Sequence, residues 1–151
     1  MIPNFSAHGL LPKGVHDCTL SEIELRFCWT PRRRALFSGL QRFISDEIVP
    51  AGLHCPLWID GSFVRNKPEP NDIDIVLDLT HLDDIGGLAT AMAIRLRWQE
   101  IMDAYNLDVW TRHPRLPNDL TAFFQCTGDK AAAELRIDKK HPKGVIRILE
   151  A

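Results

Sequence analysis

Asp72 and Asp74 stand one residue apart in the segment NDIDIVLDL. Side chains alternate along a strand, so both carboxylates are expected on one face, with their Cα atoms about 7 Å apart. Carboxylates at this spacing can hold one divalent ion, or two ions about 4 Å apart as in two-metal phosphoryl transfer. Mg²⁺ suits such ligands, with Mn²⁺ as the alternative. The pattern predicts a metal site, and a solvated strand face is the other interpretation.

A Gly61-Ser62 turn precedes these acids by nine residues. Glycine lets the backbone approach a ligand closely, and the N–H groups of the turn with the Ser62 hydroxyl can bind phosphate oxygens. Arg65 and Lys67 follow in the loop and are expected to contact a triphosphate. The turn therefore favours the metal site over a merely solvated face.

Asp108, in the segment NLDVW, faces away from its apolar neighbours if 107–110 is a strand. Beside the first two acids it would complete the metal cluster or act as the base for an attacking hydroxyl. Asp78 lies about 13 Å from Asp74 at the usual strand rise, too far to join them, and we expect it to face solvent.

The Gly-Ser turn, the nine-residue loop, Asp-Ile-Asp and the later apolar-Asp-apolar strand resemble the nucleotidyltransferase superfamily of the DNA polymerase β type. The resemblance covers roughly residues 32–110. It implies that Gly61 and Ser62 hold the triphosphate, that Asp72 and Asp74 bind Mg²⁺, and that Asp108 completes the metal site. The implied activity is transfer of a nucleoside monophosphate from a triphosphate to a hydroxyl, with release of pyrophosphate.

Nearly the whole chain, through IPNF, GSFVRNKPEPNDIDIVL and HPKGVIRIL, resembles small bacterial and phage proteins within that superfamily. A more distant similarity is to the minimal nucleotidyltransferases of toxin–antitoxin pairs, although the turn here carries Phe63 and Asn66 and no second glycine. The resemblance implies a toxin–antitoxin or phage-defence setting. The acceptor would be a tRNA or a protein, and a separately encoded partner would present it, because the chain has no second domain to grip one.

Two other functions remain open. One is a catalytically degenerate, antitoxin-like binding protein with the same fold, and the other is a phosphodiester hydrolase that uses the same acids. Among the remaining candidates, Arg32-Arg33-Arg34 is interpreted as a solvated helix face and Asp60 as a cap of the turn. A basic stretch, Lys139 to Arg147, is a secondary candidate for contacting a triphosphate or polynucleotide. The tryptophans 58, 98 and 110 are interpreted as core residues, with stacking of one of them on a nucleobase as the alternative.

The elements that must position these residues follow from periodicity and stop signals. Thr19 and Glu22 form a capping box that predicts a short helix to about Phe27, and Pro31 opens a helix to about Ile48. Strands are expected at 56–59, 72–79, 107–110 and 145–149, and helices at 86–103 and from Asn118-Asp119 to 125. Residues 129–140 are polar with no predicted element. The order predicts an α/β (α+β) fold with a small mixed sheet flanked by helices.

Composition bounds the remaining possibilities. The chain has 151 residues, 45% hydrophobic and 25% charged, which predicts one domain of 31–151 with an extended arm and short helix at 1–30. A net charge of -2 argues against bulk attraction to nucleic acid or membrane. The four cysteines lack a CxxC pair, which favours reduced thiols over zinc or disulfides. No signal peptide or ~20-residue apolar span is present, so we expect a cytoplasmic protein.

Overall fold

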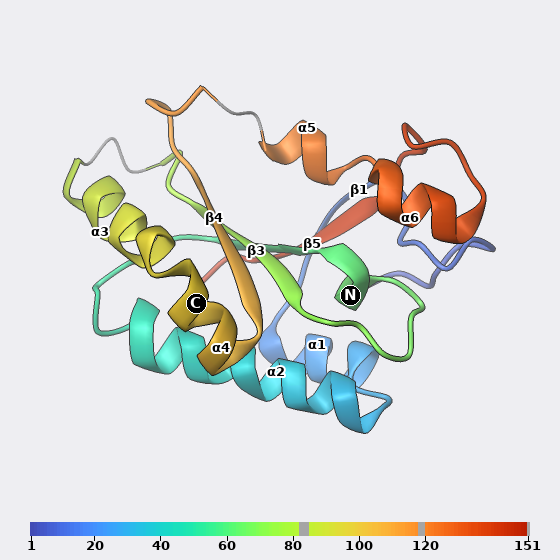
Figure 1. Cartoon of the computed structure of the whole chain (residues 1–151), viewed down its shortest axis with the longest axis horizontal. Coiled ribbons are helices and arrows are strands. Elements are labelled where there is room, and N and C mark those ends of the chain that lie inside the picture. The colour runs from blue at the N-terminus through green and yellow to red at the C-terminus, as the bar shows by residue number, and fades with distance from the viewer. Residues whose placement is uncertain (82–84, 118–119, 151) are drawn as a thin grey trace.

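The computed structural model describes residues 1–81, 85–117 and 120–150. They form a mixed five-stranded sheet in the order β1-β5-β2-β3-β4, with helices on both faces (Figure 1). The predicted fold class, a small mixed sheet flanked by helices, is confirmed. The two outer pairs of the sheet, β1–β5 and β3–β4, are parallel, whereas the two inner pairs, β5–β2 and β2–β3, are antiparallel.

The strands are β1 (Gly14–Asp17), β2 (Leu57–Asp60), β3 (Ile73–Asp78), β4 (Leu107–Arg112) and β5 (Gly144–Ile148). The α-helices are α1 (Leu20–Phe27), α2 (Pro31–Phe43), α3 (Ile85–Leu96), α4 (Trp98–Tyr105), α5 (Leu120–Phe124) and α6 (Gly128–Leu135). A π-helical turn, η1 (Ile44–Ile48), extends α2, and a 3₁₀ turn, η2 (Gly61–Val64), follows β2.

The first two helices begin as their capping residues predict. Thr19 Oγ1 accepts from the Glu22 N–H at 3.2 Å, and the Glu22 carboxylate accepts from the Thr19 N–H at 3.0 Å, which completes the capping box. Thr30 caps α2, with Pro31 at its first position. The single helix predicted over 86–103 is instead two helices, α3 and α4, which meet at Arg97 and form the crossover between the parallel strands β3 and β4.

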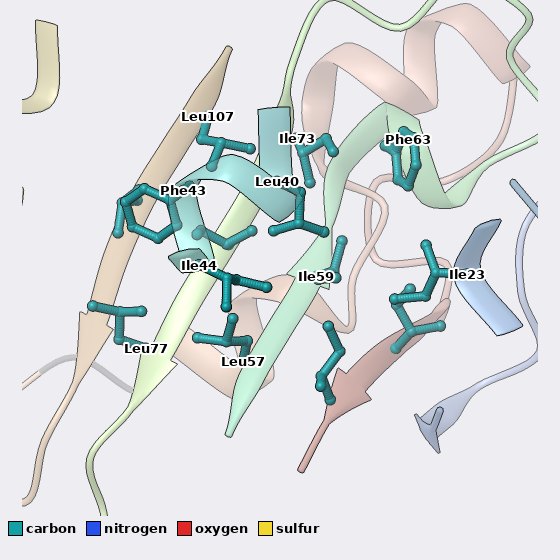
Figure 2. Close-up of a cluster of buried hydrophobic side chains, with 14 of the residues drawn as sticks. Ile23, Leu40, Phe43, Ile44, Leu57, Ile59, Phe63, Ile73, Leu77 and Leu107 are labelled. Carbon is teal, nitrogen blue, oxygen red and sulfur yellow. The ribbon is translucent and has the colours of Figure 1, made fainter. Parts of the chain in front are cut away.

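The main core lies on one face of the sheet, beneath α1, α2 and α4. Figure 2 shows Leu40, Phe43 and Ile44 of the α2–η1 segment lying over the strands. Their partners are the alternate strand residues Leu57, Ile59, Ile73, Leu77 and Leu107, all at most 1% exposed. This alternation leaves the intervening residues of β2, β3 and β4 on the opposite face, where the acids are.

That opposite face is partly covered by a smaller cluster in which Phe124 of α5 packs with Trp58, Val76 and Val145. The prediction that Asp78 faces solvent is wrong, since its side chain is buried here. Its carboxylate accepts from Trp58 Nε1 at 3.0 Å and from the Thr80 hydroxyl at 2.6 Å. Burial opposes the shift, but these hydrogen bonds and the Arg112 charge lower the pKa of Asp78.

Three other segments differ from expectation. The N-terminal arm is not merely laid over the domain, because β1 pairs in parallel with β5 and Leu10 and Leu11 are buried. Residues 129–140, predicted without an element, contain most of α6. The predicted cap at Asn118-Asp119 lies outside the described residues, although α5 follows it. Within the described ranges, no helix is long and apolar enough to span a membrane.

Candidate functional site

Three aspartates form a row across adjacent strands at the end of the sheet beside the Gly-Ser turn. Asp60 of β2 is the register partner of Asp74 in β3, and Asp74 is the register partner of Asp108 in β4. Neighbouring strands lie about 4.8 Å apart, so this pairing brings three carboxylates onto one narrow strip of the sheet. Asp72 lies immediately before β3, so the structure brings Asp72, Asp74 and Asp108 to the same sheet end.

Asp60 is the buried member of this row and is paired with a cation. Lys143 Nζ donates to both carboxylate oxygens, at 2.6 and 2.7 Å, and the side chains of both residues are less than a tenth exposed. Burial raises the pKa of Asp60, and the Lys143 charge opposes that shift. Asp60 is thus more than a cap of the turn: its charge is matched by a lysine from 83 positions further along the chain.

Among the described residues Asp74 forms no ion pair, and the Lys143 charge opposes its neighbours only in part. Burial, with the charges of Asp72, Asp60 and Asp108, raises the pKa of Asp74 to about 7. Gly61 permits this crowding: its φ is +79°, and a Cβ there would lie 1.8 Å from Oδ2 of Asp74. A larger residue at position 61 would therefore collide with the carboxylate. The Gly61 backbone and the Asp74 carboxylate are in direct apposition, as a shared metal–phosphate site requires.

The other two predicted acids differ in their surroundings. Burial and the Asp108 charge raise the pKa of Asp72, with Lys130 of α6 in opposition. Asp108 forms an ion pair with Arg95 of α3 at 3.4 Å, in which both side chains are about one-third exposed. A metal ion that bound Asp108 would therefore have to displace Arg95. Among the described residues, no group of three or more His, Cys, Asp or Glu side chains converges to hold a metal ion.

A cleft of about 350 Å³ opens beside Asp72 and Asp74. One part of its lining is the predicted phosphate turn, and the other comes from the α5–α6 segment. Its lining residues on the sheet side are Gly61, Ser62, Arg65, Lys67, Asn71, Asp72, Asp74 and Lys143. A larger hollow of about 670 Å³, lined by 17–22 and 148–150, contains none of the predicted site residues.

Arg65 and Lys67, the predicted triphosphate contacts, line the cleft, but both bind a carboxylate of the chain itself. Arg65 Nη2 lies 2.9 Å and Lys67 Nζ 3.1 Å from the two oxygens of Glu134 on α6. These hydrogen bonds lower the pKa of Glu134. A phosphate group entering here would meet cations that already hold one anionic group, and it would have to share or replace Glu134.

The loop between the turn and the acids is held by the start of α2. Arg33 is fully buried, and its guanidinium donates to the carbonyls of Phe27, Phe63, Arg65 and Lys67 at 2.6–3.1 Å. Its Cζ lies 3.7 Å from the centroid of the Trp29 ring. The interpretation of the arginine run as a solvated face is therefore wrong for Arg33. A guanidinium fork can satisfy several carbonyls at once, so Arg33 fixes this loop in the absence of a second glycine.

Thr30 and Arg32, close to Arg33 at the start of α2, form further hydrogen bonds with the same loop. Thr30 Oγ1 donates to the Pro68 carbonyl at 2.9 Å, and Arg32 donates to the carbonyls of Pro70 and Asn71. From the other side, the Asn66 N–H donates to the Gly9 carbonyl of the N-terminal arm at 2.8 Å. The loop over residues 63–71, which leads to Asp72, is thus held by hydrogen bonds at both of its ends.

Sequence reasoning missed several residues of the site. Lys143 belongs to the basic stretch that was a secondary candidate for nucleotide contact, but its pairing with Asp60 was not predicted. Lys130, Phe123 and Glu134 lay in segments without a predicted role. The tryptophan candidates 58, 98 and 110 are not among the lining residues of the cleft. Trp58 is buried, and Arg95 lies 4.3 Å above the ring of Trp110. The proximity of Asp108 to Asp74 was expected, whereas the place of Asp60 in the acidic row was not.

Comparison with known proteins yields one family. No curated protein and no solved structure matches the chain significantly. A family model described as "Family of unknown function (DUF6932)" matches residues 3–149, which include every strand, the acidic row, the turn and Lys143. The chain therefore belongs to this family, DUF6932.

Proposed function

We propose that this protein is a Mg²⁺-dependent nucleotidyltransferase. The observation that carries the proposal is the apposition of Gly61 with Asp74, which is the middle member of a row of acids whose outer members, Asp60 and Asp108, pair with Lys143 and Arg95. Like charges held this close are unfavourable unless a cation joins them. A cleft beside them contains the turn and basic residues that triphosphate binding needs.

The roles follow from position and chemistry. Asp72 and Asp74 offer the oxygen ligands that suit Mg²⁺, and Asp108 would join them on leaving Arg95. The metal would supply charge neutralisation at the phosphates. Gly61 and Ser62 would hold the phosphate oxygens, with Arg65 and Lys67 beside them. Lys143, by pairing with Asp60, limits the charge beside Asp74. Catalysis would come from positioning and electrostatic stabilisation.

In the proposed reaction an acceptor hydroxyl attacks the α-phosphorus of a nucleoside triphosphate. A P–O bond to the acceptor forms, the bond to the β-phosphate bridging oxygen breaks, and pyrophosphate leaves. The hydroxyl proton passes to Asp108 or to water. The acceptor is a hydroxyl of a protein or RNA, presented by a separate partner, and a toxin–antitoxin or phage-defence setting fits such an arrangement.

Label transfer tests this proposal. The protein is incubated with Mg²⁺, a cell lysate and each nucleoside triphosphate, labelled either at the α- or at the γ-phosphate. Relative to lysate alone, we expect the added protein to increase entry of the α label, and not of the γ label, into protein or RNA, and Asp74→Asn to abolish that increase. No increase of the α label, or an undiminished increase with Asp74→Asn, would contradict the mechanism.

One observation favours a second candidate, a degenerate binding protein of the same fold. Glu134 occupies Arg65 and Lys67, and Arg95 occupies Asp108, so internal partners hold three predicted ligand groups. Such a protein would bind nucleotide or a partner protein without transfer. Nucleotide binding that is independent of Mg²⁺, with no label transfer, would identify it.

A further inference from the structure

The cleft beside the acids has a second side, built from the α5–α6 segment. The residues of this segment that line the cleft are Phe123, Thr127, Gly128, Asp129, Lys130 and Ala131. Among all the described lining residues, Phe123 is the one aromatic side chain, and the others are polar, charged or small. A planar apolar group thus stands at the edge of an otherwise polar cleft.

Phe123 is unusual for its exposure. Its side chain is 70% exposed, whereas the adjacent Phe124 is 7% exposed and packs onto the sheet with Trp58, Val76 and Val145. The two rings meet edge to face, with centroids 5.4 Å apart and planes at 83°. Phe124 therefore anchors α5 while Phe123 presents its ring to solvent at the cleft.

The segment that carries Phe123 is fastened to the rest of the molecule. Thr127 donates from its N–H and its hydroxyl to the His141 carbonyl, at 3.1 and 2.8 Å. The Gly128 N–H donates to the Lys139 carbonyl at 3.0 Å, and the Lys143 N–H donates to the Gln125 carbonyl at 2.9 Å. At the far end of α6, Glu134 binds Arg65 and Lys67 of the phosphate loop. Such fastening holds a binding surface in place before the ligand arrives.

We propose that Phe123 is the base-stacking platform of this cleft: the nucleobase of the bound triphosphate lies on its ring while the phosphates reach Gly61, Ser62 and the acids. This inference rests on the proposed nucleotide-binding function and assigns the nucleoside end of the site to α5. Stacking on an aromatic ring tolerates any base, because every base has a π face. The platform therefore contributes affinity for the nucleoside rather than choice among the four bases.

Calorimetry with two probes separates the platform from the phosphate site. The first probe is whichever of ATP, CTP, GTP and UTP binds most tightly with Mg²⁺, and the second is inorganic tripolyphosphate with Mg²⁺. We expect Phe123→Ala to weaken nucleotide binding roughly 10-fold and to leave tripolyphosphate binding unchanged. Phe123→Trp should keep nucleotide affinity and show quenching of fluorescence beyond that of the wild type.

Leu25→Ala is the matched control, because Leu25 is an exposed apolar residue, 91% exposed, on α1. It should change neither probe. Wild-type nucleotide affinity in Phe123→Ala, or an equal loss for both probes, would overturn the platform while leaving the phosphate site intact. If the wild type binds neither probe, the proposed function fails and the platform fails with it.

Discussion

At the scale of single residues, the site is a set of unlike carboxylates on one strip of sheet. Asp60 is matched by Lys143 and Asp108 by Arg95, whereas Asp74 is held among acids and against the Gly61 backbone. Neighbouring groups that differ this much are typical of functional sites, where local stability is given up for chemistry. Asp74 is therefore the residue at which stability and function should conflict most clearly.

The pKa of Asp74 is about 7, against an ordinary value of 3.8, so ionisation of this carboxyl group is expected to lower the stability of the folded protein. The folded protein holds this proton more tightly than the unfolded chain, so stability falls as the pH rises from about 4 to 7 and the cost is complete above that range. We expect Asp74→Asn, which cannot ionise, to raise the melting temperature of the metal-free protein at pH 8 by at least roughly 3 °C, and to have little effect at pH 4.

Thermal scans in EDTA at both pH values measure this difference. Asp103→Asn, at an exposed carboxylate of α4, serves as the control and should show no such pH dependence. A melting temperature for Asp74→Asn at or below that of the wild type at pH 8 would show that the carboxylate is not destabilising.

At the scale of elements, the N-terminus of α2 organises the loop that joins the turn to the acids. Thr30, Arg32 and Arg33 together bind carbonyls from Phe63 to Asn71. Side chains of α2 satisfy the hydrogen-bonding needs of these loop carbonyls, so the loop can be ordered without forming a helix or a strand. The helix thus sets the position of both ends of the candidate site.

Arg33→Lys tests this role of α2. Lysine keeps the charge but lacks the fork, so several buried carbonyls lose their donor, and we expect the free energy of unfolding to fall by about 3 kcal/mol. Urea denaturation measures the loss, and hydrogen exchange should show faster exchange across residues 63–71. Arg34→Lys, at the exposed neighbour with one carbonyl contact at 3.2 Å, should cost less than about 0.5 kcal/mol. Equal effects of the two substitutions would refute the special role of Arg33.

Local patterns in the sequence were sufficient for much of this fold. The strict alternation of Ile73, Ile75 and Leu77 predicts β3, and the capping box predicts the start of α1, because both signals depend on near neighbours. The Gly-Ser turn and the two close acids are likewise local. The break between α3 and α4 is not marked by glycine or proline, so a continuous helix was the natural prediction.

Long-range pairings were beyond such reasoning. Asp60 pairs with Lys143, 83 positions away in the chain, and Arg65 pairs with Glu134, 69 positions away. Arg33 binds carbonyls of 63–67 that are at least 30 positions away, and only its bond to the Phe27 carbonyl is local. Asp78 was predicted to face solvent because its burial with Trp58 depends on the pairing of β2 with β3, which its own neighbours in the sequence do not reveal.

At the scale of the whole molecule, the N-terminal segment completes the sheet. β1 covers the edge of β5, and Gly144 approaches the arm so closely that a Cβ would lie 2.1 Å from the Pro12 carbonyl oxygen. Cys18, just after β1, and Cys55, just before β2, are both buried, whereas Cys126 is exposed. All four thiols are free, as predicted from their spacing.

Thiol reactivity reports on this arrangement. Burial raises the pKa of Cys18 to about 12 and that of Cys55 to about 11, so both should be protonated and inaccessible. In native buffer at pH 8, iodoacetamide should label Cys126 first and leave Cys18 and Cys55 unmodified until denaturant is added. Peptide mass spectrometry resolves the sites. Early labelling of Cys18 would mean that the N-terminal segment does not stay packed as the structure has it.

Calorimetric titration of each nucleoside triphosphate into the wild type and Asp74→Asn, with Mg²⁺ and with EDTA, tests whether the two aspartates bind a metal together with the nucleotide. If Asp72 and Asp74 hold a metal that bridges to the phosphates, the wild type will bind at least one triphosphate in Mg²⁺ at least ~10-fold more tightly than in EDTA, and Asp74→Asn will lose that difference. Binding that is equal with and without Mg²⁺, or a metal dependence that survives in Asp74→Asn, would contradict the account.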